Sequence, residues 1–247
     1  MAKYGPVSAF ILVGGKNLTG DTFGLVDRIE TVAEETHALG DSWEEHIPVG
    51  LSRVVLEAPG GIYDDGDVGM IAAFRGQGAT LQLVSYGVEG NTIGQDAVLL
   101  NGTYAMSFER IAARDGLTKA DARHTITGEY LRGVILHEIA AETAASGDTE
   151  SAESVDNSAS SADGATADLH VPALALGGYT DVTVKVRHST DDISFSDLIV
   201  FTNVSTAGSA ERKTVAGTIN RYLAMSWLFN GAGSSQSVTP YVALNRG

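Results

Sequence analysis

The residues of this chain that could support catalysis lack the spacings that known active sites require. His137 and Glu138 begin like the zinc-binding motif His-Glu-x-x-His, but residue 141 is an alanine, so the second histidine is missing. No serine lies in a Gly-x-Ser-x-Gly turn. Lys16 follows two glycines, but its segment lacks the residue order of a phosphate-binding Walker loop. We therefore expect the protein not to be an enzyme.

The metal-ligating residue types are equally scattered. The histidines show no paired spacing on one face; they are residues 37, 46, 124, 137, 170 and 188. The run from Asp64 to Asp67 resembles part of a calcium loop but lacks the later bidentate glutamate. Adjacent acidic pairs such as Glu44-Glu45 and Asp191-Asp192 point to opposite sides of a strand, so they indicate surface charge. We expect no metal site and no cofactor.

The overall composition narrows the function classes further. The chain has 247 residues, with 16 Lys and Arg against 31 Asp and Glu, for a formal net charge of −15. So acidic a chain is poorly suited to bind nucleic acid or anionic lipid. Cysteine is absent, which excludes disulfide scaffolds and thiolate chemistry. The longest N-terminal apolar run, Ala9–Val13, is too short for a signal peptide, and no membrane span is present, so we expect a soluble protein.

Apolar residues recur mostly at every second position, which predicts an all-β or β-dominated fold. Turn residues such as Gly60-Gly61 and Asn101-Gly102 separate the apolar segments. Only Asp67–Arg75 and one turn at Thr118–Arg123 have a helical pattern. The expected strands are Ala9–Val13, Thr22–Glu35, Leu51–Ala58, Thr80–Glu89, Thr103–Ala112, Glu129–Ile139, Asp181–His188, Leu198–Val204, Arg221–Phe229 and Ser237–Leu244.

One acidic, Ala- and Ser-rich segment divides the chain. Residues 141–168 hold seven acids and no Lys or Arg, which is typical of a mobile loop or linker. We therefore predict a β domain over residues 1–140 and a C-terminal β-sandwich over residues 169–247. The alternative is a long hairpin loop within a single domain, because strand-like sequence flanks the segment on both sides.

The expected strand Thr22–Glu35 is unusual because it has polar residues at both odd and even positions. This pattern indicates that its faces meet water, another subunit or an aqueous lumen. The following loop, His37–Ile47, exposes Trp43 among acidic residues. It is either an ordinary surface loop or a contact loop for a partner subunit, since aromatic residues often anchor interfaces.

Three segments together resemble the tail tube (major tail) proteins of long-tailed bacteriophages. The first runs from Phe10 to Asp65 and includes a strand ending in Gly14-Gly15, the polar strand, the long loop and the turn GGIYDDG. The second runs from Ser85 to Glu138. The third begins at Gly177 with GGYTDVTVKVRHSTDD and looks like the β-sandwich modules of phage structural proteins.

The resemblance implies rings, usually hexamers, that stack into a hollow virion tail tube through which DNA passes without specific binding. In such a tube Thr22–Glu35 and Leu51–Ala58 would form the lumen hairpin, with Asp67–Arg75 as an outer helix. The candidate ring-stacking residues are His37, Asp41, Trp43, Glu44, Glu45 and His46. The candidate lumen-facing acids are Asp27, Glu30, Glu34 and Glu57. Assembly would take place in the host cytoplasm, with other tail proteins as partners and no membrane insertion.

The C-terminal module is the departure from a minimal tube subunit. Such modules decorate tube exteriors and sometimes bind glycans, which makes Tyr179, Asp191 and Asp192 candidate glycan or ion contacts, whereas Trp227 suits core packing better. Strands of the second half could instead complete the tube subunit. Two other functions stay open: a capsid decoration protein, and a glycan-binding adhesin module of the virion.

Overall fold

The computed structural model of the chain describes residues 9–20, 26–35, 46–62, 73, 81–111, 119–126 and 128–247. These residues lie mostly in β-strands, which confirms the expected all-β class. The strands form two sheets, one of eleven and one of five strands.

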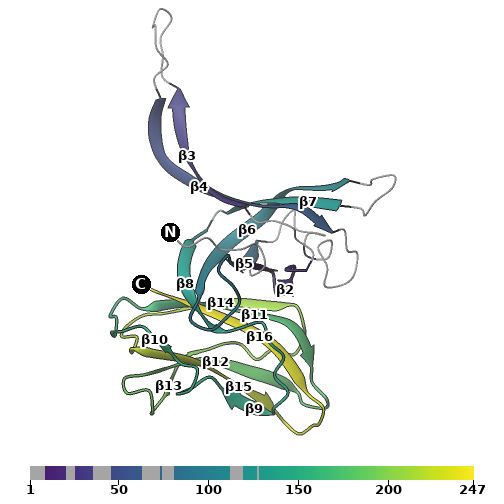
Figure 1. Cartoon of the computed structure of the whole chain (residues 1–247), viewed down its shortest axis with the longest axis vertical. Helices are drawn as coiled ribbons and strands as arrows, with labels where there is room; N and C mark the ends of the chain where they lie inside the picture. The colour runs from purple at the N-terminus through teal and green to yellow at the C-terminus, as the bar shows by residue number, and fades with distance from the viewer. Residues whose placement is uncertain are drawn as a thin grey trace, which may run out of the picture.

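The larger sheet contains a path of eight strands in the order β14-β11-β16-β8-β6-β5-β1-β2. This path curls on itself, because β2 contacts β11 and β5 contacts β14 near the opposite end. Figure 1 shows β2 and β5 lying over β14 and β11. The bounds are β1 (Phe10–Val13), β2 (Lys16–Asn17), β5 (Gln82–Gly87), β6 (Asp96–Ile111), β8 (Tyr130–His137), β11 (Ala165–Ala175), β14 (Ser209–Val215) and β16 (Ser237–Arg246).

Three further strands branch from this sheet and project from the body. β7 (Lys119–Ile126) pairs with β6 and with β4 (His46–Ile62), and β4 pairs with β3 (Val26–Glu35). The β3–β4 hairpin extends away from the rest of the molecule (Figure 1). Its register runs from Val26 opposite Glu57 to Glu35 opposite His46, with an irregularity between Thr31 and Ala33.

The smaller sheet closes a β-sandwich against β8, β11 and β16. It consists of β9 (Ser146–Asp148), β10 (Val155–Asp156), β12 (Asp181–Ser189), β13 (Ser196–Val200) and β15 (Tyr222–Asn230). Val182, Val184 and Val186 alternate inward along β12, as a half-buried strand requires. They pack with residues of the larger sheet such as Leu169 and Val242 in the main hydrophobic core.

β1 is buried on both faces, which explains its uninterrupted apolar sequence Phe-Ile-Leu-Val. Ile11 and Val13 join a cluster with Leu56, Val84, Tyr86 and Leu100 at the base of the hairpin. Phe10 and Leu12 join a second cluster on the other face, with Leu99, Ile135 and Tyr241. The strand therefore holds the projecting hairpin and the curled sheet together.

Each expected strand contains or overlaps an observed strand. Neither of the two expected helical segments is confirmed. The predicted turn of helix at Thr118–Arg123 is wrong, because Lys119–Ile126 is strand β7, paired on both sides. Pairing with β4 and β6 overrides the local preference of a polar, Ala-containing segment. The predicted helix Asp67–Arg75 lies outside the described residues, except for Ala73, which is buried.

Residues 141–168, for which the sequence predicts a loop or linker, include short strands. The segment contains β9, β10 and the first residues of β11, and Thr149, Val155 and Ala167 are buried. The predicted module boundary at Leu169 therefore falls inside β11. Short edge strands and small alanine side chains can pack without the large apolar residues by which a core is usually recognised.

Candidate functional site

The β3–β4 hairpin carries the residues predicted to line a lumen. Asp27, Glu30 and Glu34 lie on β3, and Glu57 lies on β4 opposite Val26. Of the predicted stacking loop, His37, Asp41, Trp43, Glu44 and Glu45 lie outside the described residues. His46 does not belong to a loop, since it is the first residue of β4 and pairs with Glu35.

Glu57 is part of an ion-pair cluster at the base of the hairpin. Arg28 Nη2 lies 2.5 Å from Glu57 Oε2, and Arg123 Nε lies 3.5 Å from Glu57 Oε1. The three residues come from three adjacent strands: Glu57 of β4 pairs with Arg123 of β7, and Arg28 lies on β3 two residues beyond Val26, which pairs with Glu57. The charge of Glu57 is therefore offset locally by two guanidinium groups, which the prediction of an acidic lumen did not foresee.

Apolar side chains at the start of β3 are exposed. Val26 is 43% and Ile29 is 64% accessible. Along its described length β3 pairs only with β4, so its other edge offers unpaired backbone groups. An edge strand with exposed apolar residues is a surface on which another β-strand can add.

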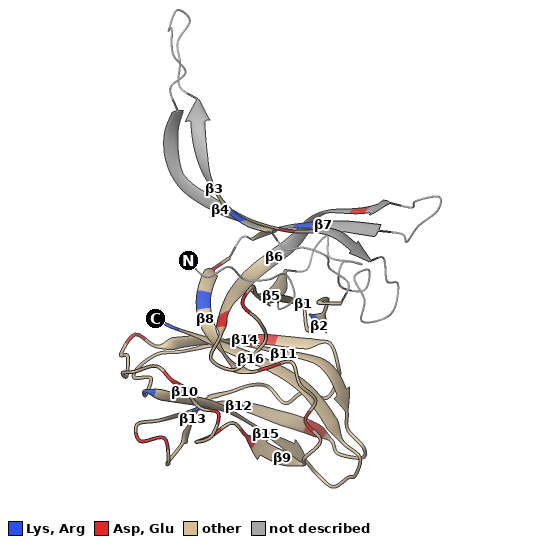
Figure 2. Cartoon of the chain, viewed as in Figure 1, with Lys and Arg blue, Asp and Glu red and all other residues tan. Residues whose placement is uncertain are grey.

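The three candidate glycan or ion contacts do not form one site. Tyr179 precedes β12 and packs against Phe229, with ring centroids 5.4 Å apart. Asp191 follows β12, and its carboxylate accepts hydrogen bonds from the Ile193 and Ser194 amides, which lower its pKa to about 2. Asp192 accepts a hydrogen bond from Ser154 Oγ. The whole length of β12 separates the tyrosine from the aspartates. Figure 2 likewise shows the described acidic residues spread over several strands and loops.

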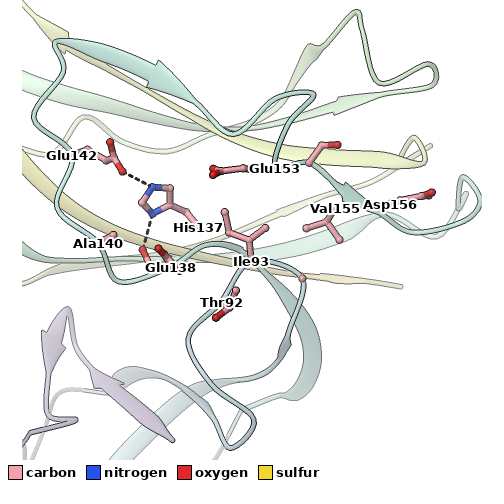
Figure 3. Close-up of a pocket in the computed structure, with 11 residues that line it drawn as sticks. Thr92, Ile93, His137, Glu138, Ala140, Glu142, Glu153, Val155 and Asp156 are labelled. Carbon is pink, nitrogen blue, oxygen red and sulfur yellow. Dashed lines mark hydrogen bonds and ion pairs between the residues drawn. The ribbon is translucent and has the colours of Figure 1, made fainter. Parts of the chain in front are cut away.

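A pocket of 610 Å³ lies between the Thr92–Gly94 turn, the end of β8 and the segment before β10 (Figure 3). His137 Nε2 lies 3.3 Å from Glu142 Oε1, and His137 Nδ1 donates to the Glu138 carbonyl at 2.7 Å. Glu153 and Asp156 line the same pocket. Within the described part of the chain, no three metal-ligating side chains are grouped so that they could hold an ion. Trp227 packs beside His137, buried as predicted for a core residue.

A buried polar network joins the two ends of the curled sheet. Asp168 of β11 accepts two hydrogen bonds from Arg212 of β14, Nε to Oδ1 at 2.7 Å and Nη2 to Oδ2 at 2.8 Å. Ser85 of β5 lies 3.4 Å from Asp168 Oδ2 and 3.0 Å from His170 Nε2. The Gly15 amide donates to His170 Nδ1 at 3.2 Å. We call Gly15, Ser85, Asp168, His170 and Arg212 the seam network.

Burial dominates the electrostatics of the seam network. Burial and the nearby Arg212 charge lower the pKa of His170 to about 3, so the imidazole is neutral. Burial raises the pKa of Asp168, while hydrogen bonds from Arg212 and Ser85 act in the opposite direction. Tyr241 lies beside His170, and burial raises its pKa well above the usual value. The Tyr241 hydroxyl has no hydrogen-bond partner in the described structure.

Ser85, His170 and Asp168 are the residue types of a hydrolytic triad, but their hydrogen bonds run the wrong way. His170 Nδ1 accepts from the Gly15 amide, so the proton of the neutral ring is on Nε2. Nε2 then donates to Ser85 Oγ and cannot act as a base toward it. The three side chains are also fully buried. The arrangement is suited to joining strands and not to catalysis.

The sequence prediction missed the seam network because its members are far apart in the chain and two of them lie on β11, within or beside the predicted linker. One signal was present. From Ala165 to Val171, small or apolar residues alternate strictly with Thr166, Asp168 and His170, which is the pattern of a strand.

No protein-family model and no curated protein matches the chain. Solved structures do match. The tail of an empty gene transfer agent particle, refined with C6 symmetry, has 11% identity and a TM-score of 0.38, and the match covers 52% of this chain and 97% of that chain. The sheath–tube complex of the extracellular contractile injection system PVC has 10% identity and a TM-score of 0.35, over 53% of this chain and 92% of that chain.

The Dit protein of phage SPP1, described as a hub adsorption apparatus protein, has 11% identity and a TM-score of 0.34. That match covers 97% of this chain and 99% of the Dit chain. The matched structures are described as parts of a gene transfer agent tail, of the sheath–tube complex of a contractile injection system and of a phage hub.

Proposed function

We propose that this chain is a structural protein of a phage-type virion tail, whose copies join through the β3–β4 hairpin into rings that stack as a hollow tube for DNA. The single observation that carries the proposal is the projecting hairpin with its unpaired β3 edge. The descriptions of the similar structures, which are tail, tube and hub components, agree with this role.

In an isolated protomer the hairpin would leave polar backbone groups unpaired and apolar side chains in contact with water. Its free edge exposes a row of backbone donors and acceptors, and Val26 and Ile29 expose apolar surface beside it. Pairing with the hairpin of a neighbouring copy would satisfy the edge and bury both side chains. Repeating the same contact around an axis closes a ring, as heterologous interfaces do when the rotation returns to the start.

The charge of the chain suits a channel that DNA crosses without binding. A net charge of −15 repels phosphates and offers little counterion release. Glu57 contributes less to this repulsion than an unpaired carboxylate would, because Arg28 and Arg123 pair with it. The repulsive role would then fall to those of Asp27, Glu30 and Glu34 that face the lumen; Asp27 and Glu30 differ in parity along β3, so the three acids cannot all face the same way.

The test is negative-stain electron microscopy of the purified protein across a concentration series, for the natural chain and two variants. Ile29→Asp places a charge on the proposed contact, and Ile193→Asp places one on a sandwich loop. Both isoleucines are highly exposed, at 64% and 79%, so neither change should affect folding of the protomer. Circular dichroism checks that folding is unchanged.

We expect hollow rings or tubes of uniform diameter for the natural chain and Ile193→Asp, and single protomers for Ile29→Asp. Stacked tubes support the tube role, whereas discrete rings that never stack support a ring elsewhere in the tail. Protomers at every concentration, even after mixing with assembled tails, would overturn the proposal and favour a decoration or glycan-binding protein.

A further inference from the structure

The curled sheet brings its two end strands together along a line, but their described residues are not joined by a ladder of backbone hydrogen bonds. The strand path ends at β14 on one side and β2 on the other. Gly15, in the turn before β2, lies so close to the Ser209 carbonyl of β14 that a side chain there would collide with it. Yet among the residues that the structure describes, no backbone hydrogen bond joins β2 to β14. Side chains hold this line instead.

The seam network supplies these contacts from both sides. Gly15 and Ser85 belong to the N-terminal strands, and Asp168, His170 and Arg212 belong to the sandwich strands. The links that the seam network makes across the line are hydrogen bonds to His170 or Asp168. Asp168 is itself fixed by the two bonds from Arg212, whose side chain is only 9% accessible. The network is therefore one connected unit.

We propose that the seam network is a latch: it keeps the curled sheet closed, and when it is broken the molecule opens locally along this line while the sandwich remains folded. The sandwich has its own core, in which β11 takes part through Ala167, Leu169 and Val171. These residues alternate with Asp168 and His170, so the core and the seam network lie on opposite faces of β11. A local opening therefore leaves that core intact, and it frees the edges of β2 and β14. Proteins open in such cooperative parts when one boundary is weaker than the rest.

The inference does not depend on the proposed assembly, because it concerns a single protomer. Its alternative is that the seam network is an ordinary part of one cooperative core. In that case, breaking it would lower the stability of all strands equally. The two possibilities differ in where amide protons exchange, and not in how much stability is lost.

Native-state hydrogen–deuterium exchange at neutral pH distinguishes them. Ser85→Ala removes the hydroxyl that links Asp168 to His170, with little change in volume. Ile199→Val is the matched control, because it removes one methyl group from the sandwich core on β13. Asp168→Asn is a stronger second variant, because it leaves Arg212 with only the exposed Glu129 as a counter-charge.

With Ser85→Ala we expect the amides of residues 10–18 to exchange about ten- to a hundredfold faster, the effect of two lost buried hydrogen bonds. β12, β15 and the β14 amides paired with β11 should stay protected. Ile199→Val should give the reverse pattern. Asp168→Asn should accelerate exchange at the same amides more strongly than Ser85→Ala does. If the Asp168→Asn protein does not fold, the exchange pattern of Ser85→Ala alone tests the proposal. Equal acceleration in all strands, or no acceleration at the seam, would overturn the latch.

Discussion

The neutral, buried state of His170 makes the stability of this protein depend on pH, and the size of the effect follows from the structure. The pKa of His170 is lowered to about 3 in the folded chain, against an ordinary value of 6.5, because the ring is fully buried beside Arg212. Below pH 6.5 the unfolded chain therefore binds a proton that the folded chain excludes. Stability must fall as the pH drops from 6.5 toward 3.

The loss of unfolding free energy can be calculated between pH 8 and pH 5. At pH 5 the unfolded histidine favours its protonated form by about thirtyfold, whereas the folded one is still neutral, so the free energy of unfolding falls by about 2 kcal/mol between pH 8 and pH 5. Over the whole shift the loss approaches about 5 kcal/mol. The range ends at pH 5 because carboxylates begin to titrate below it.

The assay is urea unfolding at pH 8, 7, 6 and 5 for the natural chain and for His170→Asn. Asparagine keeps an acceptor near the Gly15 amide but does not titrate. His188→Asn is the control, since His188 also accepts a backbone amide, from Asn220 at 3.2 Å, but is only partly buried. Burial lowers its pKa too, so the control should remove a smaller part of the pH dependence.

We expect His170→Asn to be less stable than the natural chain at pH 8 and to lose about 2 kcal/mol less on going to pH 5. All other histidines titrate equally in both proteins and cancel in the difference. If the two curves of unfolding free energy against pH run parallel from pH 8 to pH 5, His170 is not held neutral and the described hydrogen-bond directions are wrong.

Three further substitutions test the packing around the same region and the sandwich. Asp168→Asn removes the buried partner of Arg212 and leaves only the exposed Glu129, 3.4 Å from Nη1, as a counter-charge, so it should cost about 3 kcal/mol in urea unfolding. The exposed pair Asp156–Arg221 is the control, and Asp156→Asn should leave the unfolding midpoint nearly unchanged. A comparable loss from both would contradict the burial argument. Tyr241→Phe removes a buried hydroxyl without a partner in the described structure, so thermal unfolding should show equal or higher stability; a clear loss would reveal a hydrogen bond that we have missed. Gly147→Ala places a methyl group against the Trp227 ring and should cost about 1–3 kcal/mol, whereas Gly20→Ala, in open space, should be neutral in the same melting experiment.

Much of the fold could be predicted because its strands follow simple periodicity. β12 alternates valines with polar residues, and its predicted limits differ from the observed ones by a single residue. The resemblance to tail tube proteins implied a hairpin of Thr22–Glu35 with Leu51–Ala58, and β3 does pair with β4. These features are local, so the sequence around each position contains the information that defines it.

The failures have a common physical cause, which is that long-range pairing decides the structure of weakly patterned segments. Lys119–Ile126 becomes β7 only because β4 and β6 lie on either side of it. The first four residues of β11, Ala165–Asp168, were placed in the predicted loop or linker because they are small or polar. The seam network combines residues from β5, β11 and β14, and no local pattern reveals that they meet.

β3 and β11 show why polar residues on a strand do not by themselves indicate exposure. On β11 the polar positions Asp168 and His170 alternate with apolar ones, as on a strand with one solvated face, yet both are fully buried because β5 and the Gly15 turn fold over them. Covering that face was possible only because Arg212 and Ser85 satisfy the polar groups. On β3 no strand of the same chain covers the outer edge in the described structure, and Ile29 stays exposed. In the proposed assembly a second copy of the hairpin covers this edge, because it can supply backbone hydrogen-bond partners along β3, which a DNA strand cannot.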